Sequence, residues 1–313
     1  MLDVRRLRLL RELHHRGTIA AVAEALAFTP SAVSQQLAAL EREAGVALLE
    51  RTGRRVTLTP AARGLVGHAE AVLERLEQAA AELAATRAVA GPLRVGAFPT
   101  AARRIVPSAL AALGVEHPEL VASVWEIDPA EVAPAVRGGD LDVALVHSYD
   151  GVPDPPEAGI ATAPLFAEPM YLAVPRGWAP EGGAPEESAD PLARWRDVAW
   201  IVAPPTTRCG SMTAGACRAA GFVPQVRHVV DDFATAVALV GVGHGVAMVP
   251  ELGIEGPHPE VAFTPLPMRR HTSAAFRRGA GGHPAIAAFV AAVRAAGSTR
   301  GTPGGQESHF PAL

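Results

Sequence analysis

The first 58 residues carry apolar positions at helical spacing in three short segments. The first two segments predict helices with the following buried faces: Val4, Leu7, Leu10 and Leu13 in the first, and Val22, Ala23 and Leu26 in the second. Thr18 is placed to cap the second helix, and residues 27–29 break it.

A third helix is predicted from Pro30, and it is the best-defined element of this region. Thr29 is a suitable N-cap, and proline at the first helical position loses no hydrogen bond. Gly45 is placed to end the helix, and its buried face holds Val33, Leu37 and Leu40. Residues 51–59 have a glycine turn between β-prone ends, so they predict a two-stranded hairpin.

A long helix is predicted from Pro60 until Gly91 and Pro92 end it. Its apolar positions repeat at spacings of three and four over about three heptads: Ala62, Leu65, Ala69, Val72, Leu76, Ala79, Leu83 and Thr86. This seam favours a two-helix coiled coil, and therefore a dimer. The alternative is a helix that packs only on its own domain.

After Pro92, strand-like and helix-like segments alternate, which predicts a largely parallel sheet covered on both faces. Strands are expected at residues 93–98, 121–127, 141–146, 169–174, 199–203, 226–230 and 245–250. Helices are expected at residues 100–113, 129–137, 211–220, 231–240 and 285–296. Residues 176–191 predict a surface loop, and the aperiodic tail at 298–313 predicts disorder.

The charge is unevenly distributed along the chain, although the net charge is only −4. Residues 1–60 hold nine arginines and six carboxylates, whereas the remainder holds 19 arginines and 26 carboxylates. A basic head on an acidic body indicates that the head meets an anion. No run of eighteen apolar residues and no secretory signal is present, so we expect a cytoplasmic protein without a membrane partner.

The two helices around residues 18–26 and 30–42 fit a helix-turn-helix. The side of the second helix away from its core carries Ser31 and Gln35, with Ser34 at the edge. Small and amide side chains let a helix enter the major groove, and glutamine can read adenine. We expect these three residues to contact bases and Pro30 to lie at the DNA surface beside them. Phosphate contacts are expected from Thr29, Gln36, Arg51, Arg54 and Arg55. The alternative is an ordinary exposed helix.

Residues 23–59 resemble the DNA-binding signature of the LysR-type family of bacterial transcriptional regulators. The matching positions are Ala23, Leu26, Ser31, Val33, Ser34, Leu40, Glu41, Gly45, Val46, Leu48, Arg51, Arg54 and Thr59. Leu49 and Ala62 replace a usual Phe and a usual Gly, and Pro30 and Gln35 stand where polar or basic residues are more common. Two later segments, at 138–146 and 239–250, resemble the strand leading to the family's cleft and its hinge segment.

The resemblance covers nearly the whole chain and implies an α/β architecture with three parts. These are a winged helix-turn-helix at 1–58, a linker helix at 59–90 that forms dimers, and an effector domain at 91–297. That domain is expected to have two Rossmann-like lobes of the periplasmic-binding-protein type: lobe 1 at about 91–163 and 268–297, and lobe 2 at about 164–267. The family also implies that dimers pair into tetramers on double-stranded DNA.

A small-molecule effector is expected at the carboxyl ends of the strands. Thr100 lies at a predicted helix start, where free N–H groups favour a carboxylate, and the resemblance makes this the first effector loop. Arg208 can hold an anion with two hydrogen bonds. The full candidate set is Phe98, Pro99, Thr100, His147, Ser148, Thr206, Thr207, Arg208, Thr235 and His244. It suggests an organic anion, although Thr100 as a plain cap, Arg208 as a surface residue and structural histidines remain alternatives.

Cys209 and Cys217 offer a rival, thiol-redox reading of the regulator. Cys209 follows an arginine at a helix start, where a thiolate is stabilised. The peroxide-sensing members of the family carry a cysteine pair in a similar region, but here the spacing is one residue shorter. Eight residues on a helix span about 12 Å, so a disulfide would need local unwinding.

No catalytic set, metal site or cofactor is expected. The histidines lack ligand spacing, and nothing resembles a nucleophile elbow. Residues 241–245 are glycine-rich, but they follow a helix and enter a strand, the reverse of a dinucleotide cradle. An α/β enzyme would leave the first 90 residues unexplained, and a solute-binding protein would need an export signal, which is not visible.

Overall fold

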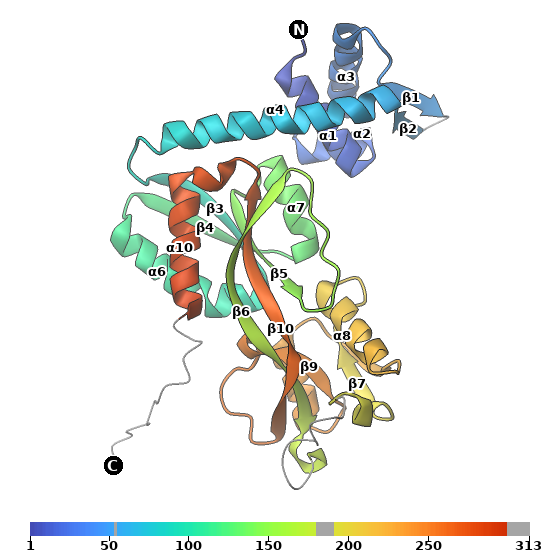
Figure 1. The fold of residues 1–313 in the computed structure, drawn as a ribbon, viewed down its shortest axis with the longest axis vertical. Coiled ribbons are helices and arrows are strands. Elements are labelled where there is room, and N and C mark those ends of the chain that lie inside the picture. The colour runs from blue at the N-terminus through green and yellow to red at the C-terminus, as the bar shows by residue number, and fades with distance from the viewer. Residues whose placement is uncertain (53–54, 180–190, 299–313) are drawn as a thin grey trace.

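The computed structural model describes residues 1–52, 55–179 and 191–298. Its first part is a head of three helices, α1 (Val4–Arg16), α2 (Ile19–Ala25) and α3 (Pro30–Ala44), followed by a hairpin of β1 (Leu49–Thr52) and β2 (Arg55–Leu58), as Figure 1 shows. These are the elements predicted from the apolar spacing. The head is joined to a larger C-terminal body by one long helix, α4 (Pro60–Ala84).

The expected caps hold the head helices. The hydroxyls of Thr18 and Thr29 accept from Ala21 N and Ala32 N, and Gly45 ends α3 in the left-handed region with φ of 69°. Val33, Leu37 and Leu40 are buried in one core with the leucines of α1. Val4 is 38% exposed, so the predicted face of α1 begins at Leu7 instead.

Helix α4 ends at Ala84, earlier than predicted. The Thr86 hydroxyl donates to Leu83 O at 2.8 Å and so occupies a carbonyl of the last turn. Gly91 and Pro92 do not end the helix but open the first strand of the body. Thr86, assigned to the seam, therefore lies beyond the helix.

The predicted seam of α4 divides into two halves. Ala62 and Ala69 are buried in the core of the head, so this half packs within the chain. Val72, Leu76 and Leu83 are 39, 49 and 70% exposed. Only the second half presents apolar side chains that a second helix could cover.

The body is built on a six-stranded sheet in the order β4-β3-β5-β10-β6-β9. The strands are β3 (Gly91–Ala97), β4 (Leu120–Glu126), β5 (Val143–Tyr149), β6 (Ile160–Pro175), β9 (Ala247–Pro250) and β10 (Val261–Arg277). Strand β3 pairs in parallel with β4 and β5, but the pairs of β10 with β5 and β6, and of β6 with β9, are antiparallel. The sheet is therefore mixed, and the prediction of a largely parallel sheet was wrong.

The missed strand β10 is the reason for this difference. It spans 17 residues beside β6, and together the two long strands run through the whole length of the body (Figure 1). Its register on β6 shifts between Pro265 and Arg269, where two prolines interrupt the pattern. A strand with prolines and adjacent arginines at its middle carries no clean two-residue period.

Helices cover both faces of the sheet in lobe 1. Val143 and Leu145 of β5 pack in the core with the helices α6 and α10, whereas Ala144 between them packs with α7. The helices of the body are α5 (Pro99–Arg104), α6 (Val106–Glu116), α7 (Pro129–Gly138), α8 (Arg208–Ala219), α9 (Phe233–Gly241) and α10 (Pro284–Ser298). The single helix predicted at residues 100–113 is thus two helices that meet at Ile105.

Lobe 2 adds a small sheet of β7 (Ala199–Val202) and β8 (Gln225–Val229), which pair in parallel. Trp200 bridges to Val246, next to β9. The predicted surface loop at 176–191 lies mostly outside the described residues, and the predicted disordered tail lies outside them from residue 299 on. Within the described ranges, no helix is both long and apolar enough to cross a bilayer.

Candidate functional site

The outer face of α3 is uncovered. Pro30, Ser31 and Gln35 are exposed and Ser34 is half-buried, whereas the opposite face of the helix forms the core. The hydroxyl of Ser34 donates to Pro30 O at 2.9 Å, and Thr29 and Ser31 share a hydrogen bond of 3.1 Å. Short side chains held against their own helix leave the long amide of Gln35 as the group that protrudes.

The flank of α3 is fixed to α1 by polar contacts. The Gln36 amide oxygen accepts from Arg6 Nε at 2.9 Å, and Arg6 also pairs with Glu43. The oxygen of Gln36 is therefore occupied while its NH₂ group stays on an exposed side chain. An amide in this state keeps its two N–H donors for an anion.

The hairpin is tied to α3 by Glu41. Its carboxylate accepts from Leu48 N at 2.9 Å and Leu49 N at 3.0 Å, which fixes where β1 begins. Thr59 donates to Ala47 O and caps α4, so the hairpin and the long helix share one anchor. Arg51 and Arg55 lie in the two strands, but their side chains, and all of Arg54, are outside what the structure describes.

A second site is a cavity of about 210 Å³ between the two lobes. Six of the predicted effector residues line it: Phe98, Pro99, Thr100, His147, Thr207 and Arg208. The wall also contains six polar residues that the sequence analysis did not select: Glu126, Asp128, Cys209, Asp231, Asp232 and Arg270. The pocket thus receives side chains from β4, β5 and β10 and from the starts of α5, α7, α8 and α9.

Arg270 forms the floor of this pocket. It is 1% exposed, donates from Nε to Glu168 at 2.9 Å and from an η nitrogen to the Thr100 hydroxyl at 3.0 Å, and lies 4.9 Å from the centre of the Phe98 ring. Burial lowers the pKa of Arg270, but the charge and hydrogen bond of Glu168, together with Tyr149 and Cys209, outweigh this and raise it. Since the Thr100 oxygen accepts from Arg270, its own proton is free to be donated to a ligand.

His147 stands beside this floor. It is 5% exposed, packs edge-on against Phe98 and Tyr149, and has a buried Nδ1 without a partner among the described residues. Burial lowers the pKa of His147 well below its usual value, and the charges of Arg270 and Arg208 add to this. The imidazole is therefore neutral, with one nitrogen available to a ligand.

Four of the predicted effector residues do not line the pocket. Strand β5 continues through His147 and Ser148 to Tyr149, so neither residue follows the strand as predicted, and alternation turns Ser148 away from the side of His147. The others are held or placed elsewhere: Thr206 is exposed, Thr235 donates to Asp232 at 2.8 Å, and His244 pairs with His228 at 2.9 Å.

The two cysteines lie in different surroundings. Cys209 lines the pocket, and its sulfur is 3.1 Å from the Tyr149 hydroxyl. Burial raises the pKa of the Cys209 thiol, although the Tyr149 hydrogen bond acts against this. Cys217 is fully buried in the core of lobe 2, and α8 is continuous between the two. The thiol pair is thus separated by an intact helix.

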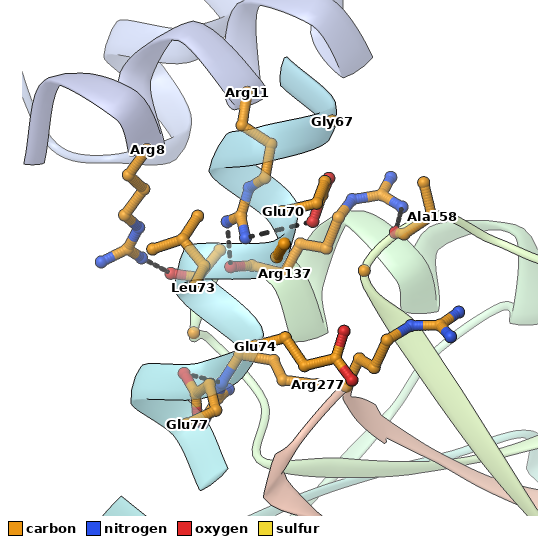
Figure 2. Close-up of a pocket in the computed structure, with 15 residues that line it drawn as sticks. Arg8, Arg11, Gly67, Glu70, Leu73, Glu74, Glu77, Arg137, Ala158 and Arg277 are labelled. Atoms are coloured by element: carbon orange, nitrogen blue, oxygen red, sulfur yellow. Dashed lines mark hydrogen bonds and ion pairs between the residues drawn. The ribbon is translucent and has the colours of Figure 1, made fainter. Parts of the chain in front are cut away.

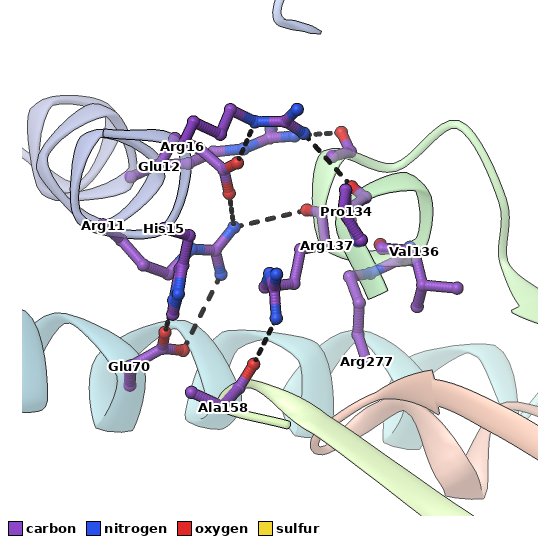
Figure 3. Close-up of polar contacts among 12 residues, drawn as sticks. Arg11, Glu12, His15, Arg16, Glu70, Pro134, Val136, Arg137, Ala158 and Arg277 are labelled. Carbon is purple, nitrogen blue, oxygen red and sulfur yellow. Dashed lines mark hydrogen bonds and ion pairs between the residues drawn. The ribbon is translucent and has the colours of Figure 1, made fainter. Parts of the chain in front are cut away.

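Helix α7 connects the pocket with the head. Its N-cap Asp128 and its first residue Pro129 line the pocket. At its other end, Arg8 of α1 donates to Gly138 O. Arg11 and Arg16 of the same helix donate to Arg137 O and Pro134 O (Figure 3). These three hydrogen bonds, here called the α1–α7 contact, place positive charge at the negative end of a helix dipole.

Glu12 organises the arginines of this contact. It is fully buried and accepts from Arg11 at 2.8 Å and from Arg16 at 2.9 Å. Burial raises the pKa of Glu12, but the hydrogen bonds and charges of the two arginines outweigh this and hold it below its usual value. The carboxylate is therefore ionised when the contact is formed.

Below the α1–α7 contact lies a polar cavity of about 620 Å³ between α1, α4 and the body (Figure 2). Ion pairs line this cavity. Arg277 lies 2.8 Å from a carboxylate oxygen of Glu77, and Arg11 lies 3.9 Å from one of Glu70. An interface held by ion pairs around an open cavity can rearrange at lower cost than an apolar core.

Known families and proteins match both parts of the chain. Residues 4–63 match the family described as bacterial regulatory helix-turn-helix protein, lysR family, and residues 86–298 match the LysR substrate binding domain. A probable hydrogen peroxide-inducible genes activator of Mycobacterium avium is 32% identical over 74% of this chain and 72% of its own length.

Two solved structures show the same arrangement. Full-length CbnR complexed with its target DNA is 27% identical, with a TM-score of 0.52 over 95% of this chain and 100% of its own. A full-length OxyR variant from Pseudomonas aeruginosa is 23% identical, with a TM-score of 0.61 over 94% of this chain and 95% of its own, and shares the fold. The predicted combination of an N-terminal helix-turn-helix and a C-terminal α/β effector-binding domain is thereby confirmed.

Proposed function

Because this chain belongs to the LysR family of bacterial regulators, we propose that it binds operator DNA through α3 and changes that binding when a small molecule occupies the pocket between the lobes. The observation that carries the proposal is the uncovered face of α3, where Ser31 and Gln35 are exposed beside a basic head. A groove-reading helix requires this exposure.

On the DNA, Ser31, Ser34 and Gln35 contact base edges near Pro30. The N-terminal end of α3 enters the groove first, as in other helix-turn-helix proteins. Phosphates are held by the following residues: Thr29, Gln36, Arg51, Arg54 and Arg55. The Gln36 amide donates to a phosphate oxygen because its own oxygen is already bound by Arg6.

In the pocket, the effector presents an anionic group to Thr100, His147 and the first turn of α8. The Thr100 proton and the His147 Nδ1 have no competing partner among the described residues. Arg208 contributes positive charge from the rim, although it also pairs with Asp154. Lobe closure on the effector pulls on the Asp128 end of α7.

The α1–α7 contact transmits this movement to the head. Helix α7 has ten residues, and its two ends contact the pocket and α1 directly. A shift of this helix therefore changes the angle of the head and the position of α3 in the groove. Half-site spacing is set by the dimer, so a change of head angle changes operator affinity.

Dimers form through the exposed half of α4, where Val72, Leu76 and Leu83 lie uncovered. Pairs of dimers form tetramers on DNA. The protein acts in the cytoplasm, where its DNA lies, and as a binding protein without catalysis of its own. Sedimentation of the full chain distinguishes monomer, dimer and tetramer directly.

A second candidate is a thiol-redox response at Cys209. Two observations favour it: Cys209 opens onto the same pocket as Thr100, and the Mycobacterium avium relative is named for induction by hydrogen peroxide. The raised pKa of Cys209 acts against it, because the thiolate is the reactive form. Peroxide treatment of the wild type and of Cys209→Ser separates the readings: only a redox sensor loses its peroxide-dependent DNA response in the variant.

The direct experiment is gel retardation and footprinting of DNA upstream of the protein's own gene, with and without metabolites made by neighbouring gene products. The proposal expects a footprint with two or more half-sites that changes when one metabolite is added. Absence of retardation at low salt, with folded full-length protein, would overturn it.

A further inference from the structure

The rim of the pocket carries carboxylates from both lobes. Asp128 comes from lobe 1, where it caps α7, and Asp231 comes from lobe 2, two residues before α9. Both line the cavity, and neither forms an ion pair within the described ranges. Asp232 beside them differs, because it lies 3.7 Å from Arg103 and accepts from Thr235.

These carboxylates interact across the opening. Burial raises the pKa of Asp231, and the negative charges of Asp128 and Asp232 raise it further. Two like charges on opposite lobes oppose closure of the cleft. A purely anionic ligand would add a third negative charge to this rim.

The buried floor of the pocket carries hydrogen-bond donors and a positive charge, which complement the acidic rim. Arg270 is buried on its floor, the Thr100 hydroxyl has a proton to donate, and the imidazole of His147 has an orphan Nδ1 although it is 5% exposed. A buried polar atom without a partner indicates a missing ligand group. The buried donors of the floor and the more exposed acids of the rim therefore line one small cavity.

Resting on the function proposed above, the geometry points to a small zwitterion of the amino-acid class as the effector, with its carboxylate at Thr100 and His147 and its ammonium between Asp128 and Asp231. The cavity of about 210 Å³ corresponds to the liquid volume of roughly seven waters at about 30 Å³ each, which suits a molecule of this size. The ammonium replaces repulsion between the lobes with two attractive contacts. The sequence suggested an organic anion as the effector. The pocket narrows that class to anions that also have an ammonium group.

The test uses matched probes on the full-length chain. The twenty common L-amino acids are screened by the shift in Tm, each beside its 2-hydroxy acid, which keeps the carboxylate but lacks the ammonium. Affinities of the hits are then measured by calorimetry. We expect at least one amino acid to bind at least tenfold more tightly than its hydroxy acid, because hydrogen bonds to charged groups are the strongest available.

Two variants test whether the rim carboxylates bind the ammonium group. Asp231→Asn and Asp128→Asn each remove a charge, and asparagine still caps α7 in the second. Each should weaken binding of the amino acid at least tenfold, whereas the affinity of the hydroxy acid should stay the same or rise, because one negative charge of the rim is gone. Asp197→Asn, an exposed carboxylate of lobe 2 outside the pocket, should change neither affinity. Urea unfolding of each variant checks that the fold is intact.

The inference is overturned if no amino acid binds, if a hydroxy acid binds as well as its amino acid, or if both rim variants keep wild-type affinity. A hydroxy acid that binds as tightly as its amino acid and alters the footprint would remove the zwitterion and leave the proposed regulator standing. If the unliganded protein does not retard its upstream DNA, the proposed regulatory function is wrong, whatever the amino acids and hydroxy acids bind.

Discussion

Removal of the outer two arginines of the α1–α7 contact, in the variant Arg8→Ala with Arg16→Ala, should uncouple the pocket from the head. Arg8 donates to Gly138 O, and Arg16 donates to Pro134 O at 3.2 Å. Glu12 loses its partner Arg16 but keeps Arg11 at 2.8 Å, so its buried charge stays compensated. The substitutions therefore weaken the interface while the core of the head remains intact.

The expected loss follows from two charge-to-carbonyl hydrogen bonds. Such bonds contribute about 1.5–3 kcal/mol when fully buried and less when water can replace them. The side chain of Arg16 is 19% exposed and Arg8 is partly buried, so about 1 kcal/mol for each bond is appropriate. The sum of about 2 kcal/mol lowers the equilibrium constant for forming the α1–α7 contact about 30-fold. This is within the range of about 1–3 kcal/mol that is typical of coupling free energies in proteins.

The assay is operator affinity with and without the effector, expressed as a ratio. We expect the ratio for the double variant to approach one. Arg5→Ala is the matched control, since Arg5 is an exposed arginine of the same helix and its removal changes the charge of the head but not the contact. A double variant with the same ratio as Arg5→Ala would refute transmission through α7.

Three further outcomes are expected. Arg54→Ala should weaken all DNA sequences alike and flatten the slope of affinity against salt, and an unchanged slope in filter binding would remove its phosphate role. Thr100→Val should abolish the effector response while footprinting still shows operator binding; a retained response would place the effector elsewhere. The pKa of Glu12 is lowered on folding, so its ionised form stabilises the protein above pH 4.5, and this stabilisation is lost as the pH falls below that value. The difference in urea midpoint between wild type and Glu12→Gln should therefore be largest at pH 7 and shrink in acid, and a constant difference would contradict the assignment.

Local signals explain why the head was predictable. A capping threonine, a proline at the first helical position and three apolar residues at helical spacing all lie within about three turns of one helix, from Thr29 to Leu40. The buried pair of Arg270 and Glu168 is the opposite case. The two residues are 102 positions apart and meet only because β10 and β6 pair in that register. In a chain whose basic residues are all arginine, a single arginine carries no signal of burial.

The pocket was predictable only in part, because some of its residues are marked by local signals and others meet only in the folded chain. Residues at the start of a helix that follows a strand, such as Thr100, or at a helix cap, such as Thr207, were found from the pattern. His147 was placed beyond its strand, but β5 pairs with β10 as far as Tyr149, and this pairing decides where the strand ends. The acids of the rim were missed because Asp128 and Asp231 come from different lobes and only the folded chain brings them together.

The most direct test of the account measures affinity for every single-base variant of the footprinted operator, with wild type and with Gln35→Ala. If α3 reads bases, the variant loses about 1–3 kcal/mol on the native operator and no longer discriminates at one position of each half-site. An equal loss of affinity across all sequences would contradict this, because it would show that Gln35 touches only the backbone of the DNA.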